Sequence, residues 1–242
     1  LNILTRMGGQ AMSLDFLIRE EDFVYREKSK NHLSSHLLAD FRRCPDLYHR
    51  KRLGLIPDDD RPAFLVGRAS HTLILEGRSE FDTRFAVGGP INERTGKPYG
   101  TNTQAYEAWA STQEAQGKGC LSQEQFSLVV NLTTGVKAHP LAFDLLSMGV
   151  AEGVVRSEYC GTPCQSRIDW FNPEKGIVDL KSCDDLTWFE ADARRYGYGH
   201  QLSFYRAMVW LMTGVIHPVH LIAIEKKEPY RCGVWRVGED VL

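Results

Sequence analysis

Two aspartates and a lysine in the second half of the chain have types and spacing suited to phosphate chemistry. Asp169 lies near the end of one strand-like run, and Asp179 and Lys181 close the next run, after a short polar turn at 172–176. Two carboxylates on adjacent strands can bind a hard divalent cation. A lysine two residues beyond an aspartate lies on the same face of a strand. Carboxylates, a metal ion and a lysine together suit hydrolysis of a phosphodiester.

Three other segments contain residues that could converge on this hairpin. Gly67 and His71 are four residues apart, so they share one face of a predicted helix, although His71 alone would be interpreted as a core histidine. Gln201 and Tyr205 have the same spacing and offer an amide and a phenol to one neighbour. Segment 194–200 interleaves arginine, tyrosine and glycine, which suits phosphate contact and base stacking. Its structural alternative is a cationic helix C-terminus followed by a glycine turn.

The elements that must position these residues form a helical part followed by strands. Helices are predicted after Ser34 or Ser35, either of which could be the N-cap, and after Pro45. Further helices are expected at 63–76, near 101, from 122, at 140–149, at 186–195 and at 200–213, with 81–100 as loop and a short strand. Strands are expected around 154–155, 164–171, 177–180, 219–225 and 233–237. This order predicts an α/β (α+β) fold with a mixed central sheet flanked by helices.

We expect one domain over residues 31–242, with a helical part at 31–150 and the catalytic sheet and helices at 151–242. Residues 1–30 are predicted to be a lead-in arm. The first dozen lack the apolar core of a signal peptide, so they are interpreted as a flexible arm or an expression remnant.

Composition excludes several classes of protein. Hydrophobic content of 43% and charged content of 25% are typical of soluble globular proteins, and the apolar stretch 208–212 is too short to span a bilayer. The net charge of -2 means that any DNA contact needs a local basic surface. The six cysteines form no C-x-x-C pair, which favours reduced, structural thiols over a zinc site. The histidine pairs 32/36 and 217/220 are interpreted as surface or capping residues.

Taken in chain order, the three motifs form a specific set. Gly67-x-x-x-His71, then Asp169 with Asp179-x-Lys181, then Gln201-x-x-x-Tyr205 resembles the PD-(D/E)xK nuclease superfamily and its RecB-like branch, especially the lambda exonuclease and exonuclease VIII group. Segments 33–37 and 44–48 are similar to the opening helices of exonuclease VIII-like nucleases. The resemblance covers about residues 31 to 235 and implies a restriction-endonuclease-like core. An Ile before the first acid and an Asp as the second are variants that the family contains.

The resemblance implies a catalytic site with two Mg²⁺ ions, for which Mn²⁺ would substitute. The implied metal ligands are His71, Asp169, Asp179 and the backbone carbonyl of Leu180. Lys181 would orient or activate the attacking water and stabilise developing charge, and Gln201 would position Lys181 or the water. Two ions roughly 4 Å apart would clamp the attacking and leaving oxygens. Glu158, on the preceding strand, could face the same cleft, but the sequence does not fix its side.

DNA-binding roles follow from the same resemblance. Ser35, at a helix N-terminus beside Arg42, is a candidate contact for a 5'-phosphate. Arg194 and Arg195 would contact the DNA backbone, and Tyr205 would support the DNA or Gln201.

The implied function is a Mg²⁺-dependent 5'-to-3' exonuclease. It would degrade one strand of duplex DNA from its ends and leave 3' single-stranded tails for phage-type recombination by strand annealing. The implied assembly is a homotrimeric ring, and the implied partner is a single-strand annealing recombinase. The expected setting is the cytoplasm, with a bacterial or prophage gene and no membrane association.

Four alternative functions predict other features of the sequence or remain compatible with it. A site- or structure-specific DNA endonuclease of the same fold stays open. A non-catalytic DNA-binding module would predict loss of an acid or of the lysine, and all three are present. An iron–sulfur nuclease is disfavoured because the C-terminal cysteine cluster is lacking. A sugar- or nucleotide-metabolising metalloenzyme lacks a G-x-x-x-x-G-K phosphate loop.

Overall fold

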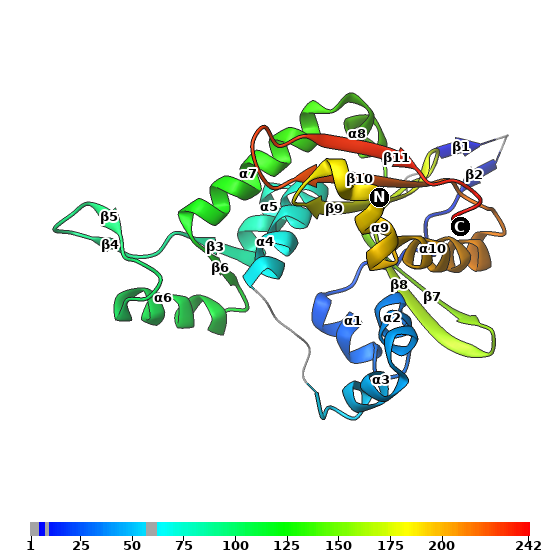
Figure 1. Cartoon of the computed structure of the whole chain (residues 1–242), viewed down its shortest axis with the longest axis horizontal. Coiled ribbons are helices and arrows are strands. Elements are labelled where there is room, and N and C mark those ends of the chain that lie inside the picture. Colours follow the sequence, from blue (N-terminus) through cyan, green and yellow to red (C-terminus); the bar gives the residue numbers. More distant parts are fainter. Residues whose placement is uncertain (1–4, 8–9, 57–61) are drawn as a thin grey trace.

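A five-stranded sheet forms the centre of the protein (Figure 1), in a computed structural model that describes residues 5–7, 10–56 and 62–242. The strand order is β11-β10-β9-β8-β7. The strands are β7 (Val150–Tyr159), β8 (Thr162–Asn172), β9 (Gly176–Cys183), β10 (Val219–Glu225) and β11 (Cys232–Arg236). Neighbours are antiparallel except β9 and β10, which run parallel. The predicted mixed sheet is therefore confirmed.

Helices cover both faces of this sheet (Figure 1). They are α7 (Gln123–Ala138) and α8 (Pro140–Leu145) on one face, and the 3-10 turn η2 (Leu186–Trp188), α9 (Phe189–Tyr196) and α10 (Tyr198–Thr213) in the β9–β10 crossover on the other. Val178 of β9 belongs to the same buried cluster as Leu132 of α7. Its neighbour Ile177 belongs to the cluster of Leu202 on α10. Strand β9 is nearly all apolar because it is buried on both faces.

A helical segment leads from the N-terminal part toward the sheet. It contains α4 (Pro62–His71), the π-helical turn η1 (Thr72–Glu76) and α5 (Arg78–Arg84). Residues 63–76 were predicted as one helix ending at Gly77, and the structure agrees except that the last turn is π-helical. Gly77 has φ +89°, a conformation that glycine adopts without strain. The loop predicted from residue 81 is wrong at its start, because Phe81 is fully buried within α5.

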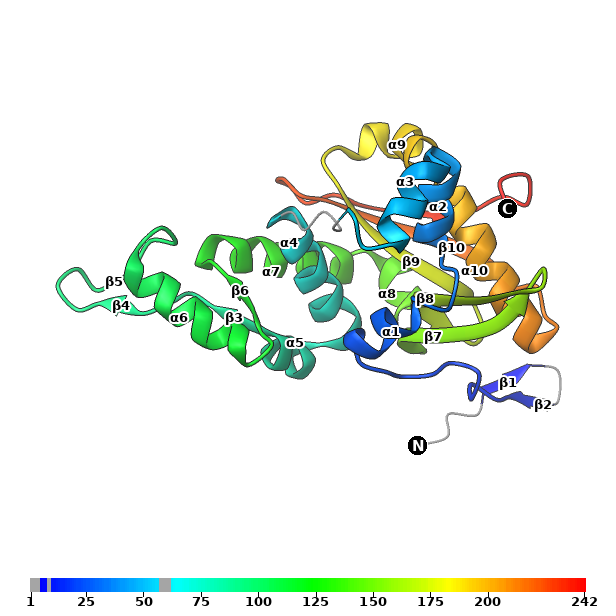
Figure 2. The same ribbon diagram turned by 90° about the horizontal axis from the view of Figure 1, so that it is seen from below.

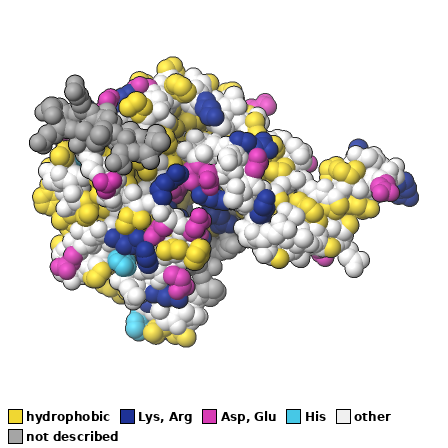
Figure 3. All heavy atoms as spheres, turned by 180° about the vertical axis from the view of Figure 1, so that it is seen from behind, with side chains coloured by type: hydrophobic (Ala, Val, Ile, Leu, Met, Phe, Trp, Pro, Cys, Tyr) yellow, Lys and Arg dark blue, Asp and Glu magenta, His cyan; other side chains and the backbone are white. Residues whose placement is uncertain are grey.

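An arm projects from the sheet between α5 and α7 (Figures 1 and 2). It comprises β3 (Phe85–Val87), β4 (Ile91–Asn92), β5 (Lys97–Pro98), α6 (Gln104–Ala115) and β6 (Gly119–Leu121). Strands β3 and β6 pair in parallel at its base, and β4 and β5 form a hairpin. Figure 3 shows apolar side chains along the arm and charged ones at its tip. On the body in the same view, basic and acidic side chains are interspersed, so this face carries no basic surface of one sign.

The N-terminal part contains a hairpin and three helices. They are β1 (Thr5–Met7), β2 (Gln10–Met12), α1 (Asp22–Lys28), α2 (Ser35–Arg43) and α3 (Pro45–Arg52). Ser34 is the N-cap of α2, and its hydroxyl accepts a hydrogen bond from the Leu37 N–H at 3.4 Å. Residues 1–4 and 8–9 of the predicted arm lie outside the described residues. No helix in the described part of the chain has the length and apolar character needed to cross a membrane.

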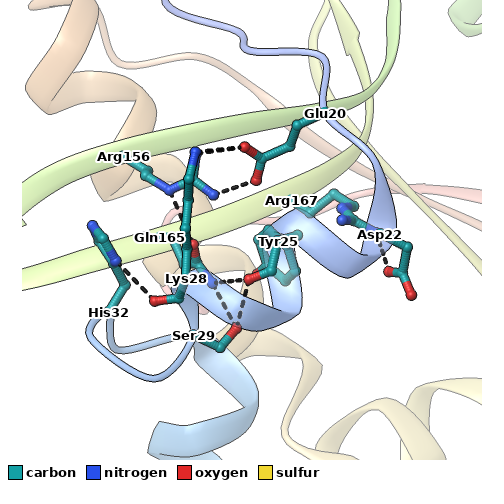
Figure 4. Close-up of polar contacts among 9 residues, drawn as sticks. All are labelled: Glu20, Asp22, Tyr25, Lys28, Ser29, His32, Arg156, Gln165 and Arg167. Atoms are coloured by element: carbon teal, nitrogen blue, oxygen red, sulfur yellow. Dashed lines mark hydrogen bonds and ion pairs between the residues drawn. The ribbon is translucent and has the colours of Figure 1, made fainter.

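Polar contacts fasten segment 20–28, which contains α1, to strands β7 and β8 (Figure 4). Arg156 of β7 binds the Glu20 carboxylate through both terminal nitrogens, one of them at 3.0 Å. Arg167 of β8 donates to Asp22 at 2.7 Å, and its guanidinium carbon lies 4.2 Å from the centroid of the Tyr25 ring. This segment is therefore fixed to the same two strands that carry the candidate site.

Candidate metal and phosphate site

Three acidic residues lie at corresponding positions of three neighbouring strands. The β7–β8 pairing places Ala151 opposite Trp170 and Gly153 opposite Ile168, so Glu152 and Asp169 face each other across the ladder. The β8–β9 pairing places Trp170 opposite Val178, and continued by one residue it sets Asp169 opposite Asp179. Directly opposite residues in antiparallel strands share one face of the sheet. Glu152, Asp169 and Asp179 therefore form a row, called here the acid row.

His71 completes one end of the acid row. It is the last residue of α4, and its Nδ1 lies 3.6 Å from Asp169 Oδ2. One ligand atom each from His71, Glu152 and Asp169 lies within 4.8 Å of the other two. Asp169 Oδ2 also accepts a hydrogen bond from the Leu180 N–H at 2.8 Å, which holds its carboxylate toward β9. An imidazole and carboxylates form a donor set suited to divalent cations such as Mg²⁺ and Mn²⁺.

Lys181 neutralises the other end of the row. Asp179 is fully buried and forms an ion pair with Lys181 Nζ, two residues along β9. Burial raises the pKa of Asp179 to about 7, and the nearby Lys181 limits the increase. Burial alone would lower the pKa of Lys181, but Asp179 and Asp169 outweigh it and the net pKa is raised. Lys181 therefore stays a cation at neutral pH.

The acid row fits a divalent cation. Burial and the adjacent Asp169 raise the pKa of Glu152 to about 8. Apart from the ion pair with Lys181, neither buried oxygen of Asp179 has a hydrogen-bond partner among the described residues. Burial also lowers the pKa of His71, which favours the neutral imidazole that metal ions bind. Without a cation, the raised pKa values keep these acids partly protonated. A bound cation would balance the negative charges of their ionised forms.

Gln201 and Tyr205 of α10 form a second pair of polar groups near the row. The Gln201 amide donates to the Tyr205 hydroxyl at 2.8 Å. Tyr205 is buried, and burial followed by the charges of Asp179 and Asp169 raises its pKa well above the ordinary value. The predicted common helix face is present, with the amide directed to Tyr205 rather than to Lys181 among the described contacts.

Comparison with known proteins identifies the family. The profile of the PDDEXK-like domain of unknown function (DUF3799) matches residues 34–242. The chain belongs to this PDDEXK-like family. No curated protein matches it. The crystal structure of a "Putative exonuclease" from Eubacterium rectale is similar, with a TM-score of 0.66 and 17% identity over 93% of this chain and 79% of that chain. At this identity the likeness shows the fold alone, and the predicted PD-(D/E)xK nuclease fold is confirmed.

The predicted DNA-binding residues on α2 line a groove, whereas those on α9 lie outside it. Ser35, in the first turn of α2, and Arg42, near its end, both line one groove of about 460 Å³. Arg194 and Arg195 lie in the last turn of α9, are exposed, and line neither this groove nor a second one of about 300 Å³. The structure thus brings the α2 pair together and leaves the α9 pair on the open surface.

Of two further expectations, one stays a prediction and one is wrong. The backbone carbonyl of Leu180 stays a predicted metal ligand, and the Leu180 N–H donates to Asp169 Oδ2. The predicted close approach of a neighbouring backbone at Gly67 is wrong, because a methyl group there would meet no described atom within 4 Å.

Glu152 is a residue of the candidate site that none of the sequence motifs contains. Glu158, whose facing the sequence left open, is exposed opposite Pro163, six residues or about 20 Å along β7 from Glu152. The turn at Cys160 and Gly161 fixes the hairpin register, and counting back from it sets Glu152 opposite Asp169. That count was a usable signal in the sequence. The count is correct only if the turn is placed to within one residue, and the turn predicted at 161–163 lies at 160–161 in the structure.

Proposed function

We propose that this protein is a Mg²⁺-dependent nuclease that digests one strand of duplex DNA from its 5' end, as in the lambda exonuclease and exonuclease VIII group. The observation that carries the proposal is the acid row with Lys181 paired to Asp179 at its end. A metal-binding row and a cation at one sheet face suit a phosphodiester, whose negative charge must be neutralised before it can be attacked. Support for end-directed digestion comes from the ordered motifs and from the Ser35–Arg42 groove.

Glu152, Asp169 and Asp179, with His71, are the residues that would hold the cation. When bound, it would supply Lewis-acid polarisation of the phosphate and an acidified water. Lys181 would donate to a phosphate oxygen or to the attacking water, because its Nζ remains charged and is fixed by Asp179. Tyr205 would keep the Gln201 amide oriented toward the substrate side.

The assembly belongs to the same proposal. Residues 31–242 would act as one catalytic unit, after a lead-in arm at 1–30. A homotrimeric ring around DNA and cooperation with a single-strand annealing recombinase are supported by the motif resemblance. A ring would need basic side chains only on its inner surface, which suits a chain of net charge -2.

Digestion of end-labelled linear duplex DNA tests this function. We expect release of nucleotides from the 5' end in Mg²⁺, faster with a 5'-phosphate than with a 5'-hydroxyl, and none in EDTA. Covalently closed circular duplex of the same sequence is the matched control and should survive. Rapid cutting of the circle would instead assign an endonuclease, and release from the 3' end would reverse the polarity.

A further inference from the structure

Two grooves between α2 and α10 adjoin each other. The smaller, of about 300 Å³, and the larger, of about 460 Å³, share Ser35, Ala39 and Gln201 as lining residues. Because the same residues line both, the two are adjacent parts of one surface, called here the α2–α10 groove. It runs from Tyr198 at the start of α10 to Trp210 in its last turns.

One end of the α2–α10 groove lies at the catalytic lysine. Tyr198 lines the smaller part, and the centroid of its ring is 5.1 Å from Lys181 Nζ. Gln201 lines both parts and donates to Tyr205, which is buried beside the acid row. A chain lying in the groove would therefore approach the proposed site of hydrolysis from one defined direction.

The lining of the groove combines cations and aromatic rings. Arg42 and Arg206 line the larger part. One terminal nitrogen of Arg206 donates a hydrogen bond to Glu239, which does not line the groove. Tyr159 and Trp210 are 37% and 46% exposed there. Among the described residues, no Asp or Glu side chain lines either part, although acids outnumber Lys and Arg in the chain by 31 to 29.

This combination matches the chemistry of an unpaired nucleic-acid strand. Guanidinium groups bind phosphates, and exposed aromatic rings stack on bases by about 1–3 kcal/mol per base. In a duplex the base faces are stacked on one another, so a duplex could use the arginines but not the rings. Because no Asp or Glu side chain lines the groove among the described residues, a phosphate backbone would meet less repulsion there than elsewhere on the chain.

We propose that the α2–α10 groove binds an unpaired segment of the DNA strand that is being cut, and leads it along α10 to Lys181. The proposal rests on the proposed nuclease function and extends it by naming where the strand lies and in which form. A strand separated from its complement at a duplex end is the substrate that this groove fits. A second copy of the chain seated on Trp210 and the neighbouring exposed Ile216 is the competing occupant.

Binding of a fluorescein-labelled oligonucleotide by the full chain in EDTA tests the groove without cleavage. Tyr159→Ala and Trp210→Ala should each weaken single-strand binding at least about fivefold and change blunt-duplex binding by less than about twofold. Trp188→Ala is the matched control, because Trp188 is 66% exposed on η2 and lines neither groove. Unchanged single-strand binding in both groove variants would overturn the proposal.

Two further measurements separate the remaining outcomes. Photocrosslinking of an iodouracil-substituted strand to the unaltered chain should place adducts on Tyr159 or Trp210, and adducts only elsewhere would also overturn the proposal. Light scattering of Trp210→Ala should show an unchanged mass; a smaller assembly with normal strand binding would assign the groove to a second copy. If the unaltered chain cuts duplex DNA in Mg²⁺ while both variants bind strands normally, the groove proposal alone fails. If no DNA is cut, the proposed function fails and the binding result still stands.

Discussion

Each carboxylate of the acid row has a different neighbour, and that neighbour determines its position or its pKa. Asp169 is held by the Leu180 N–H and faces His71, so its position is fixed before any ligand arrives. Asp179 is paired with Lys181, which lowers the cost of burying its charge. After burial, the charges of Asp169 and Arg167 influence the pKa of Glu152 most strongly. The row thus combines one acid held by a backbone hydrogen bond with two acids whose pKa values are raised.

Asp179→Asn tests the chemical role at this scale. The amide keeps the shape of the side chain but removes the charge that would bind a cation and hold Lys181. We expect Mg²⁺-dependent cleavage to fall at least about a thousandfold, with duplex binding changed less than about threefold, because phosphate contacts and chemistry use different residues. The assay is nucleotide release beside binding in EDTA. Exposed Asp240→Asn is the control, and residual cleavage by Asp179→Asn within tenfold of the unaltered chain would refute the assignment.

At the scale of elements, segment 20–28, which contains α1, is fastened to the strands of the site from outside the region matched by the family profile. It lies before residue 34, yet Glu20 and Asp22 form ion pairs with Arg156 and Arg167 on the two strands that carry Glu152 and Asp169. Glu20 is 7% exposed and Arg156 is 14% exposed in their side chains, so their pair is shielded from water. Shielded charged hydrogen bonds stabilise more than surface ones.

Glu20→Gln should therefore destabilise the protein by about 1–3 kcal/mol, measured by urea unfolding at pH 7. Hydrogen bonding by Arg156 lowers the pKa of Glu20, so the carboxylate stabilises the fold at neutral pH and this contribution disappears as acidification protonates it. The difference between the two proteins should shrink toward about pH 3. Glu27→Gln removes an exposed pair with Lys30 and should change stability by less than about 0.5 kcal/mol. Equal effects of the two substitutions would contradict the special role of the Glu20–Arg156 pair.

Element order and type could largely be predicted from the sequence, and exact register could not. Alternating and continuous apolar runs located all five strands of the sheet, because burial on one or both faces leaves that pattern. The short helix α5 was missed because Phe81 and Phe85 are buried by Leu121, a contact between distant segments that composition does not show. Asp169, Asp179, Lys181, His71 and the Gln201–Tyr205 pair were found because each has a short fixed spacing. Glu152 has none, since its place depends on cross-strand pairing.

For the whole molecule, the surface in Figure 3 carries mixed charges, while the acid row and the α2–α10 groove each carry side chains mainly of one sign. Basic and acidic side chains are interspersed over the face in Figure 3. In the acid row, Asp179 is buried and Glu152 and Asp169 are half-buried, whereas the α2–α10 groove is lined without Asp or Glu side chains among the described residues. The small net charge therefore includes a negative site, the acid row, and a positive one, the α2–α10 groove, close to each other. A cation would be drawn to the first and a polyanion to the second.

The stability of the whole molecule should depend on pH and on cations together. The raised pKa values of Asp179, about 7, and Glu152, about 8, mean that the metal-free fold keeps protons that the unfolded chain releases near pH 4. Metal-free stability contributed by these groups is therefore present at low pH and is lost as pH rises toward 8. Cation binding requires their ionised forms, so it competes with protons.

We expect Mg²⁺ or Mn²⁺ to raise the melting temperature more at about pH 8.5 than at about pH 6, as measured by calorimetry in matched ionic strength. Ca²⁺ tests whether the effect depends on charge alone, and Asp179→Asn should remove most of the pH dependence. An equal rise at both pH values would show that these two carboxylates do not bind the ion.

Glu152 has φ +52°, a left-handed conformation that is uncommon for a residue with a long side chain. Glu152 also lies opposite another acid. The residue that completes the row therefore lowers the stability of the metal-free fold, through backbone strain and through charge repulsion. Glu152→Asn should raise the melting temperature of the metal-free protein, because asparagine tolerates φ > 0 and carries no charge, while cleavage is lost. Glu152→Gln removes only the charge, so a smaller rise than with asparagine measures the backbone strain. Selection for a more heat-resistant form of this protein would then be expected to inactivate it first at residue 152.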